Sequence, residues 1–340
     1  MRWDIGIDLG TESARMAEYR QGAVLETASR LAFREGRDLP VYCGDAAARI
    51  EGRACAGIHV VSPLRDGMLE NNLYADRFLR WLYRQSEAPT LRRLHVMMTC
   101  APFARPVQQE ALLSAMTDAG AVEAALIRSD MAAAIGAGLD LNAPEAKLVI
   151  DLGAGKITCT LLTLGRAAGF GYLPYGLGRI DDRIAQIVRT EGGYRIGMKS
   201  AREIKHTLGS ALPDAAGDVI MHMTGFSMYK RLPEAFDLET APVLAACEEV
   251  VRETANLCAG IVSAAPEEIS ADLNDAGAVL VGGGAEMTGI DKRIGDTLGI
   301  PCRIADAPTK CAVRGLFEIM RDPEKYPTAF LRRAYRSTMR

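Results

Sequence analysis

Hydrophobic residues gather in short blocks along this chain, and several of these blocks end at a glycine-rich turn. The blocks at 3–9, 94–100 and 277–281 predict strands, and those at 147–152 and 157–164 predict a hairpin around glycines 153–155. Apolar residues recur at three- and four-residue steps over 106–119 and 241–264, which predicts two helices; Pro106 suits a first helical turn. Strands interleaved with helices indicate an α/β protein.

The chain also looks duplicated. Segments 4–13 and 147–158 each read as a strand, a glycine turn and a further strand. A length of 340 residues exceeds what one hydrophobic core usually supports, so two or more domains are expected. No low-complexity linker separates them, which predicts a short hinge.

Composition narrows the class of protein. Hydrophobic residues make up 49% and charged residues 24%, as in ordinary globular proteins, and the net charge of −3 argues against a nucleic-acid partner. The eight cysteines include no CxxC pair, which favours free thiols in a reducing cytosol. A strand directly after residue 4 leaves no room for a signal peptide, and no apolar run has the length of a membrane span.

The candidate chemistry lies in five Gly/Asp-rich segments: 4–13 (DIGIDLGTES), 131–139 (MAAAIGAGL), 151–158 (DLGAGKIT), 175–182 (YGLGRIDD) and 279–286 (VLVGGGAE). Three of them place a strand before a glycine turn, where backbone N–H groups can approach an anion without a Cβ in the way. Asp8 and Asp151 end two of these strands, and carboxylates beside phosphates suggest an intervening Mg²⁺, reached through water. The pattern predicts a nucleotide clamped between two similar halves.

Each turn contributes named candidates. Asp8, Gly10 and Thr11 form the first predicted phosphate loop; Asp151, Gly153, Ala154, Gly155 and Lys156 form the second; and Gly282, Gly283 and Gly284 are predicted to pack under the adenosine and α-phosphate. The alternatives are plain turns for the first loop and tight helix–strand packing for the triple glycine. For Lys156, pairing with a phosphate as a point charge and pointing to solvent stay equally open.

The order of these segments resembles the actin superfamily and, within it, the MreB family of rod-shape-determining bacterial actins. Further similar segments are 62–70 (SPLRDGMLE), 119–139, 196–211 (IGMKSAREIKHTLGSA), 225–233 (GFSMYKRLP) and 266–285. The resemblance implies an actin-like fold: a first half at 1–145 with an insertion at about 31–72, and a second at 146–325 with an insertion at about 180–250. It also implies ATP or ADP with Mg²⁺, contacts from Gly178 and Lys205, and a cytoplasmic cytoskeletal filament of this chain with itself.

Several positions depart from the family pattern. Ala154, Lys156 and Ile157 replace a glycine and two threonines of the second loop. The acidic pair and proline before "AAAIGAG" are Arg128, Ser129 and Asp130, so only Asp130, displaced by one residue, is left to position an attacking water; Asp151 is the other catalytic candidate. Family acids are also replaced by Arg179, Met198 and Arg202. These changes predict a weak ATPase at most.

The end of the chain, 326–340, is rich in arginine and has no acid after Glu324. Drawn as a helix, this segment has an apolar side and a basic side. The apolar side consists of Phe330, Leu331, Ala334, Tyr335 and Met339, and the basic side of Arg332, Arg333, Arg336 and Arg340. Such a basic amphipathic helix would bind an anionic membrane surface or a membrane protein, at the inner face of the cytoplasmic membrane, or else pack on its own domain.

Other functions share the same loops. A DnaK-like chaperone or reactivase carries them, usually with a separate substrate-binding domain. A small-molecule kinase would need a catalytic acid and an acceptor pocket, and neither is evident in the sequence. A nucleotide-binding paralogue that no longer hydrolyses ATP fits the departures from the family pattern.

Overall fold

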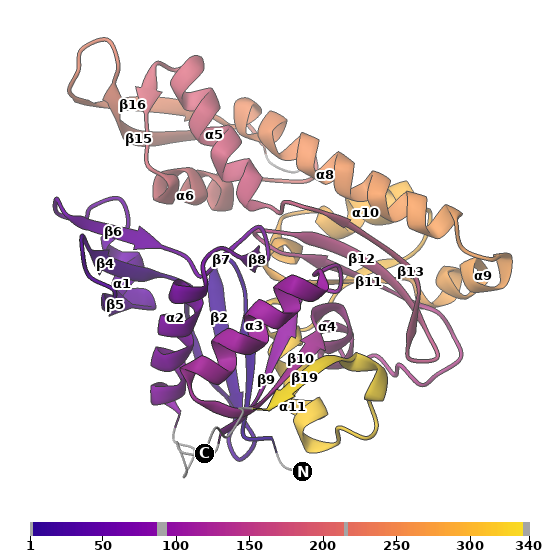
Figure 1. Ribbon diagram of the computed structural model, residues 1–340. Helices are drawn as coiled ribbons and strands as arrows, with labels where there is room; N and C mark the ends of the chain where they lie inside the picture. Colours follow the sequence, from indigo (N-terminus) through magenta and orange to yellow (C-terminus); the bar gives the residue numbers. More distant parts are fainter. Residues whose placement is uncertain (1–2, 87–93, 214–216, 336–340) are drawn as a thin grey trace.

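The first half of the protein is built on a six-stranded mixed sheet (Figure 1). The computed structural model describes residues 3–86, 94–213 and 217–335. The strands, in the order in which they lie, are β19 (Phe330–Tyr335), β10 (Ala121–Arg128), β9 (Leu94–Cys100), β1 (Ile5–Leu9), β2 (Ser13–Glu18) and β3 (Gly22–Ala28). β1, β9 and β10 run parallel, whereas β2, β3 and β19 join in antiparallel pairs.

The second half repeats this arrangement in a five-stranded sheet. Its order is β13 (Arg166–Leu173), β12 (Ile157–Thr163), β11 (Lys147–Leu152), β17 (Ala278–Val281) and β18 (Cys302–Ile304). β11 to β13 form an antiparallel meander, and β17 and β18 continue parallel to β11. Order and direction therefore match β3-β2-β1-β9-β10, and the predicted strands, hairpin and duplication are confirmed.

Two smaller sheets lie beside the main ones. β4 (Leu31–Arg34), β5 (Pro40–Cys43) and β6 (Ile58–Val61) form one, beside α1 (Asp45–Ile50); the short hairpin of β7 (Leu64–Arg65) and β8 (Met68–Leu69) follows. β14 (Tyr194–Arg195), β15 (Ile220–Ser227) and β16 (Pro233–Glu239) form the other, beside α5 (Gly178–Thr190) and α6 (Met198–Leu208). Both projections lie on the same side of the molecule in Figure 1. The exact boundaries given above for the insertions stay predictions.

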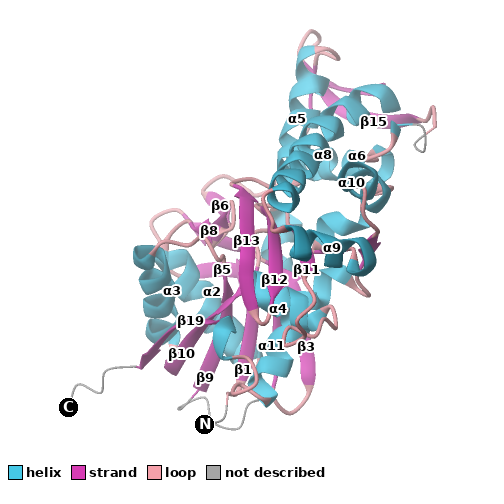
Figure 2. Ribbon diagram, turned by 90° about the vertical axis from the view of Figure 1, so that its right-hand side faces the viewer, coloured by secondary structure: helices cyan, strands magenta, loops and turns pink. Residues whose placement is uncertain are grey.

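The remaining helices cover the main sheets. α2 (Asn72–Gln85) and α3 (Pro106–Ala119) pack on the first, and α8 (Thr240–Ser263), α9 (Glu267–Ala276) and α10 (Ile290–Leu298) on the second (Figure 2). The helices predicted at 106–119 and 241–264 are thus α3 and α8. Single 3₁₀ turns occupy Gly283–Glu286, Pro308–Lys310 and Pro327–Ala329.

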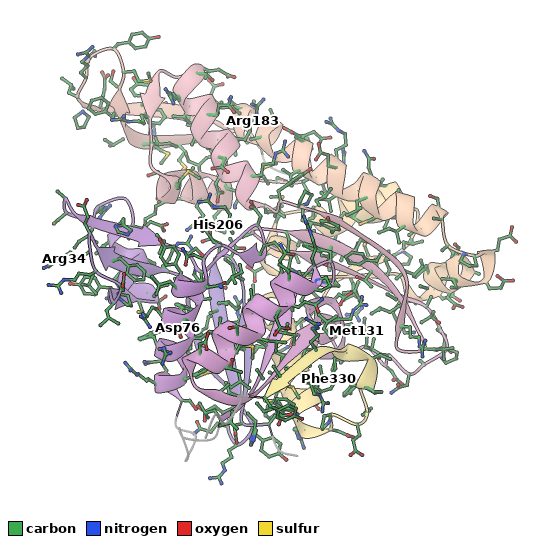
Figure 3. The ribbon with its side chains drawn as sticks, viewed as in Figure 1. Arg34, Asp76, Met131, Arg183, His206 and Phe330 are labelled. Atoms are coloured by element: carbon green, nitrogen blue, oxygen red, sulfur yellow. The ribbon has the colours of Figure 1, made fainter. Side chains whose placement is uncertain are left out.

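α4 (Ser129–Gly136) and α11 (Cys311–Arg321) lie between the two sheets and join the halves. Met131 of α4 lies in this shared core, near the middle of Figure 3. The two helices touch backbone to backbone, because a Cβ at Gly136 would overlap the carbonyl of Cys311 and a Cβ at Gly315 would overlap that of Ala132. Glycine is therefore required at the crossing for packing rather than for a turn.

The helix predicted over 326–340 is wrong for the described residues. Residues 330–335 form strand β19, which pairs antiparallel with β10 at the edge of the first sheet. Phe330, labelled in Figure 3, packs near Trp3, and their ring centroids are 6.4 Å apart. Leu331 and Ala334 pack against the core of the first half. Arg332 bonds to Glu110 on α3 at 3.0 Å. The open edge of β10 supplies backbone partners that a helix would leave unused; residues 336–340, with Arg336, Met339 and Arg340, lie outside the described part.

The glycine crossing predicts a specific sensitivity. Gly315→Ala should lower the free energy of unfolding by about 1–3 kcal/mol, because the new methyl forces the two helices apart. The matched control is Gly260→Ala in α8, where a Cβ meets nothing within 4 Å; it should stabilise by about 0.4–1 kcal/mol through the unfolded chain. Urea unfolding of both variants measures the difference, and equal effects would contradict the role of the crossing.

Candidate functional site

A cavity lies between the two halves, and the predicted loops line it. The predicted residues in its wall are Asp8, Gly10, Thr11, Asp151, Gly153, Ala154, Gly155, Lys156, Gly282 and Gly283. The predicted residues outside the wall are Asp130, Gly178, Lys205 and Gly284. Parallel strands end at this edge of each sheet, which is where ligands bind in open α/β folds.

The two phosphate-type turns have the same geometry in both halves. The N–H of Gly10 donates to the carbonyl of Ser13 at 3.0 Å, and the N–H of Gly153 donates to that of Lys156 at 2.9 Å. A Cβ at either glycine would lie 2.8 Å from the same carbonyl oxygen. Each turn is therefore closed so tightly that only glycine fits.

The turns also face each other. A Cβ at Gly155 of the second turn would overlap the hydroxyl oxygen of Thr11 in the first. That hydroxyl accepts the N–H of Gly67 at 3.2 Å, so the β7–β8 hairpin closes a third side. Two glycine turns from different halves thus oppose each other at one place, as a clamp requires.

The three late glycines have three different surroundings. Gly282 has φ +82°, and a Cβ there would lie 2.6 Å from Oδ1 of Asp151. Gly283 borders the cavity, and its Cβ would meet only the methyl of Thr309, at 3.8 Å. Gly284 is buried and packs against Leu177. Packing therefore explains Gly284, Gly283 lies open to the cavity, and contact of these glycines with adenosine and the α-phosphate stays a prediction.

Asp8 ends β1 inside the cavity. Its Oδ1 accepts the hydroxyl of Thr99 at 2.8 Å, at the end of the neighbouring parallel strand β9. Burial raises the pKa of the Asp8 carboxyl, against the opposing effect of the Thr99 hydrogen bond and Arg15. Thr99 was not singled out from the sequence, although a polar residue near the end of an apolar strand is a usable signal.

The side chain of Lys156 lies in the wall of the cavity and is largely shielded from solvent. Its side chain is 16% exposed, and its Nζ lies 3.1 Å from Oδ2 of Asp151 and 3.0 Å from Oγ of Ser129. Asp151 closes β11 and Ser129 opens α4, so the ammonium connects the second sheet to the helix between the halves.

Asp130 faces away from the cavity. Its carboxylate is 1% exposed, pairs with Arg128 at 2.6 Å and accepts the Thr160 hydroxyl at 2.9 Å. Successive helical residues are turned by about 100°, so at the start of α4 Ser129 borders the cavity while Asp130 enters the core. This position gives no support to Asp130 as the group that positions water.

Gly178 and Lys205 lie outside the cavity wall and contact residues next to it. The N–H of Gly178 donates to the carbonyl of Ala154 at 2.8 Å, which holds the second turn against α5. Lys205 pairs with Asp181 at 2.7 Å and donates to the carbonyl of Leu177 at 3.1 Å. Burial raises the pKa of the Asp181 carboxyl, and Lys205 opposes that rise.

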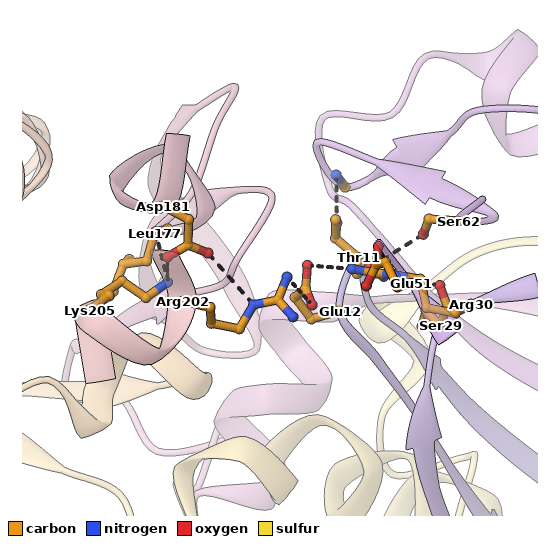
Figure 4. A network of polar contacts seen from close by, with 11 residues as sticks. Thr11, Glu12, Ser29, Arg30, Glu51, Ser62, Leu177, Asp181, Arg202 and Lys205 are labelled. Carbon is orange, nitrogen blue, oxygen red and sulfur yellow. Dashed lines mark hydrogen bonds and ion pairs between the residues drawn. The ribbon is translucent and has the colours of Figure 1, made fainter. Parts of the chain in front are cut away.

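A chain of alternating charges crosses the mouth of the cleft (Figure 4). Glu12, in the first turn, pairs with Arg30 of the first half at 2.9 Å and with Arg202 of α6 at 3.0 Å. Arg30 extends the chain to Glu51 at 3.1 Å, and Arg202 extends it to Asp181 at 3.7 Å. Arg202, where the resemblance expects an acid, thus joins the second half to the first; Glu12 was not singled out from the sequence.

The carboxylates at the cavity, Asp8 and Asp151, provide few ligands for a metal ion. Among the described residues, no three His, Cys, Asp or Glu side chains are grouped to hold one. Mg²⁺ in nucleotide sites often needs only one or two carboxylates besides phosphates, which Asp8 and Asp151 would supply. Asp151, however, already shares its charge with Lys156. In the ranges covered by the structure, no helix is long and apolar enough to cross a bilayer.

The repeated sheets, the inserted sheets and the opposed turns define an actin-like fold with a cleft between its halves. The family model described as MreB/Mbl protein matches residues 2–327, and the chain belongs to the MreB/Mbl family.

The chain is 30% identical to the cell shape-determining protein MreB of Escherichia coli (strain K12) over 320 residues, 92% of this chain and 91% of that protein. It is 27% identical to the cell shape-determining protein Mbl of Bacillus subtilis (strain 168) over 325 residues, 95% and 97% of the two chains.

Solved structures share the fold. MreB5 of Spiroplasma citri bound to AMPPNP superposes with a TM-score of 0.89 at 24% identity, covering 96% of this chain and 98% of that one. A chain of the MamK double helical filament superposes with a TM-score of 0.79 at 17% identity, covering 94% and 98%. The predicted family and fold are confirmed.

The charge chain predicts how firmly the cleft closes. Arg202→Gln removes the contact between Glu12 and the second half, and amide hydrogen exchange should rise a few-fold in the first turn and at the start of α6. The side chains are 31% and 36% exposed, so the pair contributes about 0.2–1 kcal/mol.

The control is Arg179→Gln, which breaks the exposed pair with Glu249 inside the second half and should leave exchange in the first turn unchanged. High salt should erase the difference between wild type and Arg202→Gln, because it screens partly exposed pairs. Unchanged exchange at low salt would argue against a closing role for Arg202.

Proposed function

We propose that this protein binds ATP or ADP in the cleft between its halves. The observation that carries the proposal is the meeting of two matching glycine turns, one from each half, at Thr11 and Gly155. Backbone N–H groups of glycine-rich turns suit phosphate oxygens. Support comes from MreB5 of Spiroplasma citri, whose structures are bound to AMPPNP and to ADP.

We further propose that the chain assembles with itself into cytoskeletal filaments in the cytoplasm of a bacterium, in cell shape or intracellular organisation. Relatives over more than nine-tenths of the chain are cell shape-determining proteins, and the fold is shared with the MamK double helical filament. Nucleotide would control assembly through opening and closing of the halves. Head-to-tail contacts that do not close into a ring would give a filament.

Hydrolysis in this cleft is proposed to be slow or absent. In-line attack on a γ-phosphate needs a group that positions water. The carboxylate of Asp130 already contacts Arg128 and Thr160. Ser129 offers only a hydroxyl group, whose oxygen accepts a hydrogen bond from Lys156. A paralogue that binds nucleotide without turning it over is therefore the favoured variant of this function, ahead of a kinase. Membership of the MreB/Mbl family favours a filament over a DnaK-like chaperone.

The membrane contact expected of 326–340 rested on a helix. Its residues 330–335 form β19, in which Leu331 and Ala334 pack on the first half and Tyr335 is exposed, so the expected amphipathic helix is replaced by a strand in the described part. We therefore propose a second copy of this chain as the partner, and no lipid.

Nucleotide binding can be tested at Gly283. Gly283→Asp introduces a carboxylate into the cavity at a place where the Cβ has room, so it should fold normally and weaken ATP binding by tenfold or more through repulsion of the phosphates. Gly283→Ala is the control, since it adds the same Cβ without charge and should bind nearly as wild type does. Calorimetric titration measures all three, and equal affinities would place the phosphates elsewhere.

Filament formation can be tested directly. Wild-type protein should sediment in the presence of ATP and appear as linear protofilaments by negative-stain electron microscopy. Gly283→Asp should remain in the supernatant at the same protein concentration, because assembly depends on the occupied cleft. A monomer under every nucleotide and salt condition would leave a nucleotide-binding protein without a cytoskeletal role.

A further inference from the structure

The cavity contains a cation that belongs to the protein. Nζ of Lys156 lies 3.1 Å from Asp151 and 3.0 Å from Ser129, with 16% of the Lys156 side chain exposed. Asp151 is one of the two carboxylates that the sequence offers to a hydrated Mg²⁺. The ammonium of Lys156 pairs with that carboxylate.

The position of the ammonium is fixed by its surroundings. The aliphatic stem of Lys156 runs along the β7–β8 hairpin, where a Cβ on Gly67 would lie 2.7 Å from Cδ of the lysine. The charged end is held by β11 through Asp151 and by α4 through Ser129. Groups from both halves thus hold one side chain inside the wall of the cavity.

The same ammonium acts on the other carboxylate. Asp8 experiences the charges of both Asp151 and Lys156, with opposite signs. Asp8 and Asp151 alone would place two negative charges beside incoming phosphates, and a divalent ion would have to compensate them. Lys156 offsets one of these charges, and since two of its three N–H donors face Asp151 and Ser129, one donor is left for a phosphate oxygen.

We propose that Lys156 is a built-in cation of the nucleotide site, so that this chain binds nucleoside di- and triphosphates without needing a divalent metal. The inference rests on the proposed nucleotide binding and concerns the charge balance of that same site. A phosphate oxygen entering between the two turns meets the ammonium that Asp151 and Ser129 hold in place. Mg²⁺ can still accompany the phosphates in solution, but binding does not depend on it.

The experiment is calorimetric titration of the full chain with ADP and with ATP, once in excess MgCl₂ and once in excess EDTA. Wild type should bind with affinities that agree within about threefold, because the cation needed by the phosphates is part of the protein. A loss of tenfold or more in EDTA overturns the inference while the proposed nucleotide binding stands. No binding in either buffer overturns both.

Two variants test whether binding without a metal depends on the charge of Lys156. Lys156→Thr, with the residue type usual in the family loop, should bind at least tenfold more weakly in EDTA and recover in MgCl₂, as expected when a charge-assisted contact is lost. Lys156→Met keeps the stem beside Gly67 and should behave like Lys156→Thr, which separates loss of charge from loss of packing.

The matched control is Lys310→Thr, which removes an equal charge from an exposed position next to the lining residue Thr309. It should bind as wild type does in both buffers. Metal dependence appearing equally in Lys310→Thr and Lys156→Thr would mean that net charge, rather than the ammonium in the cavity, sets the requirement. Thermal melts of all variants verify that each is folded.

Discussion

The contact on which this structure depends is the crossing of α4 and α11 between the two sheets. Gly136 and Gly315 let the two backbones touch, each glycine against a carbonyl of the other helix. The first residues of both helices, Ser129 and Cys311, line the cavity. The crossing joins the halves and leaves the first residue of each helix at the cavity wall.

The mouth of the cleft is held differently. There the halves meet through the partly exposed pair of Glu12 with Arg202, which contributes little in water and weakens with salt. The halves are thus joined by close backbone packing at α4 and α11 and by a weaker, partly exposed ion pair at Glu12. Such a distribution of contact strength is what a protein needs if its halves are to move about a shared core when a ligand enters.

Much of this architecture was accessible to sequence reasoning. The apolar blocks and glycine turns predicted β1, β9, β11, β12 and β17, because a strand buried on both faces needs a continuous apolar run. The three- and four-residue periodicity predicted α3 and α8. Residues 330–335 were misread as helical, since six residues fit either period and only the unpaired edge of β10 selects a strand.

By itself, the sequence determined the turns that border the cleft, because Gly10, Gly153 and Gly282 occupy backbone positions where a side chain would collide with a carbonyl or carboxylate oxygen. It also determined the family, through segments spread along the chain. Which charged groups meet was decided by tertiary structure alone. The rotation of α4 brings Ser129 rather than Asp130 to the cavity; the approach of β11 and α4 encloses Lys156; and the approach of the halves pairs Arg202 with Glu12. Ion pairs and hydrogen bonds depend on distance in space, which the order of residues along the chain does not give.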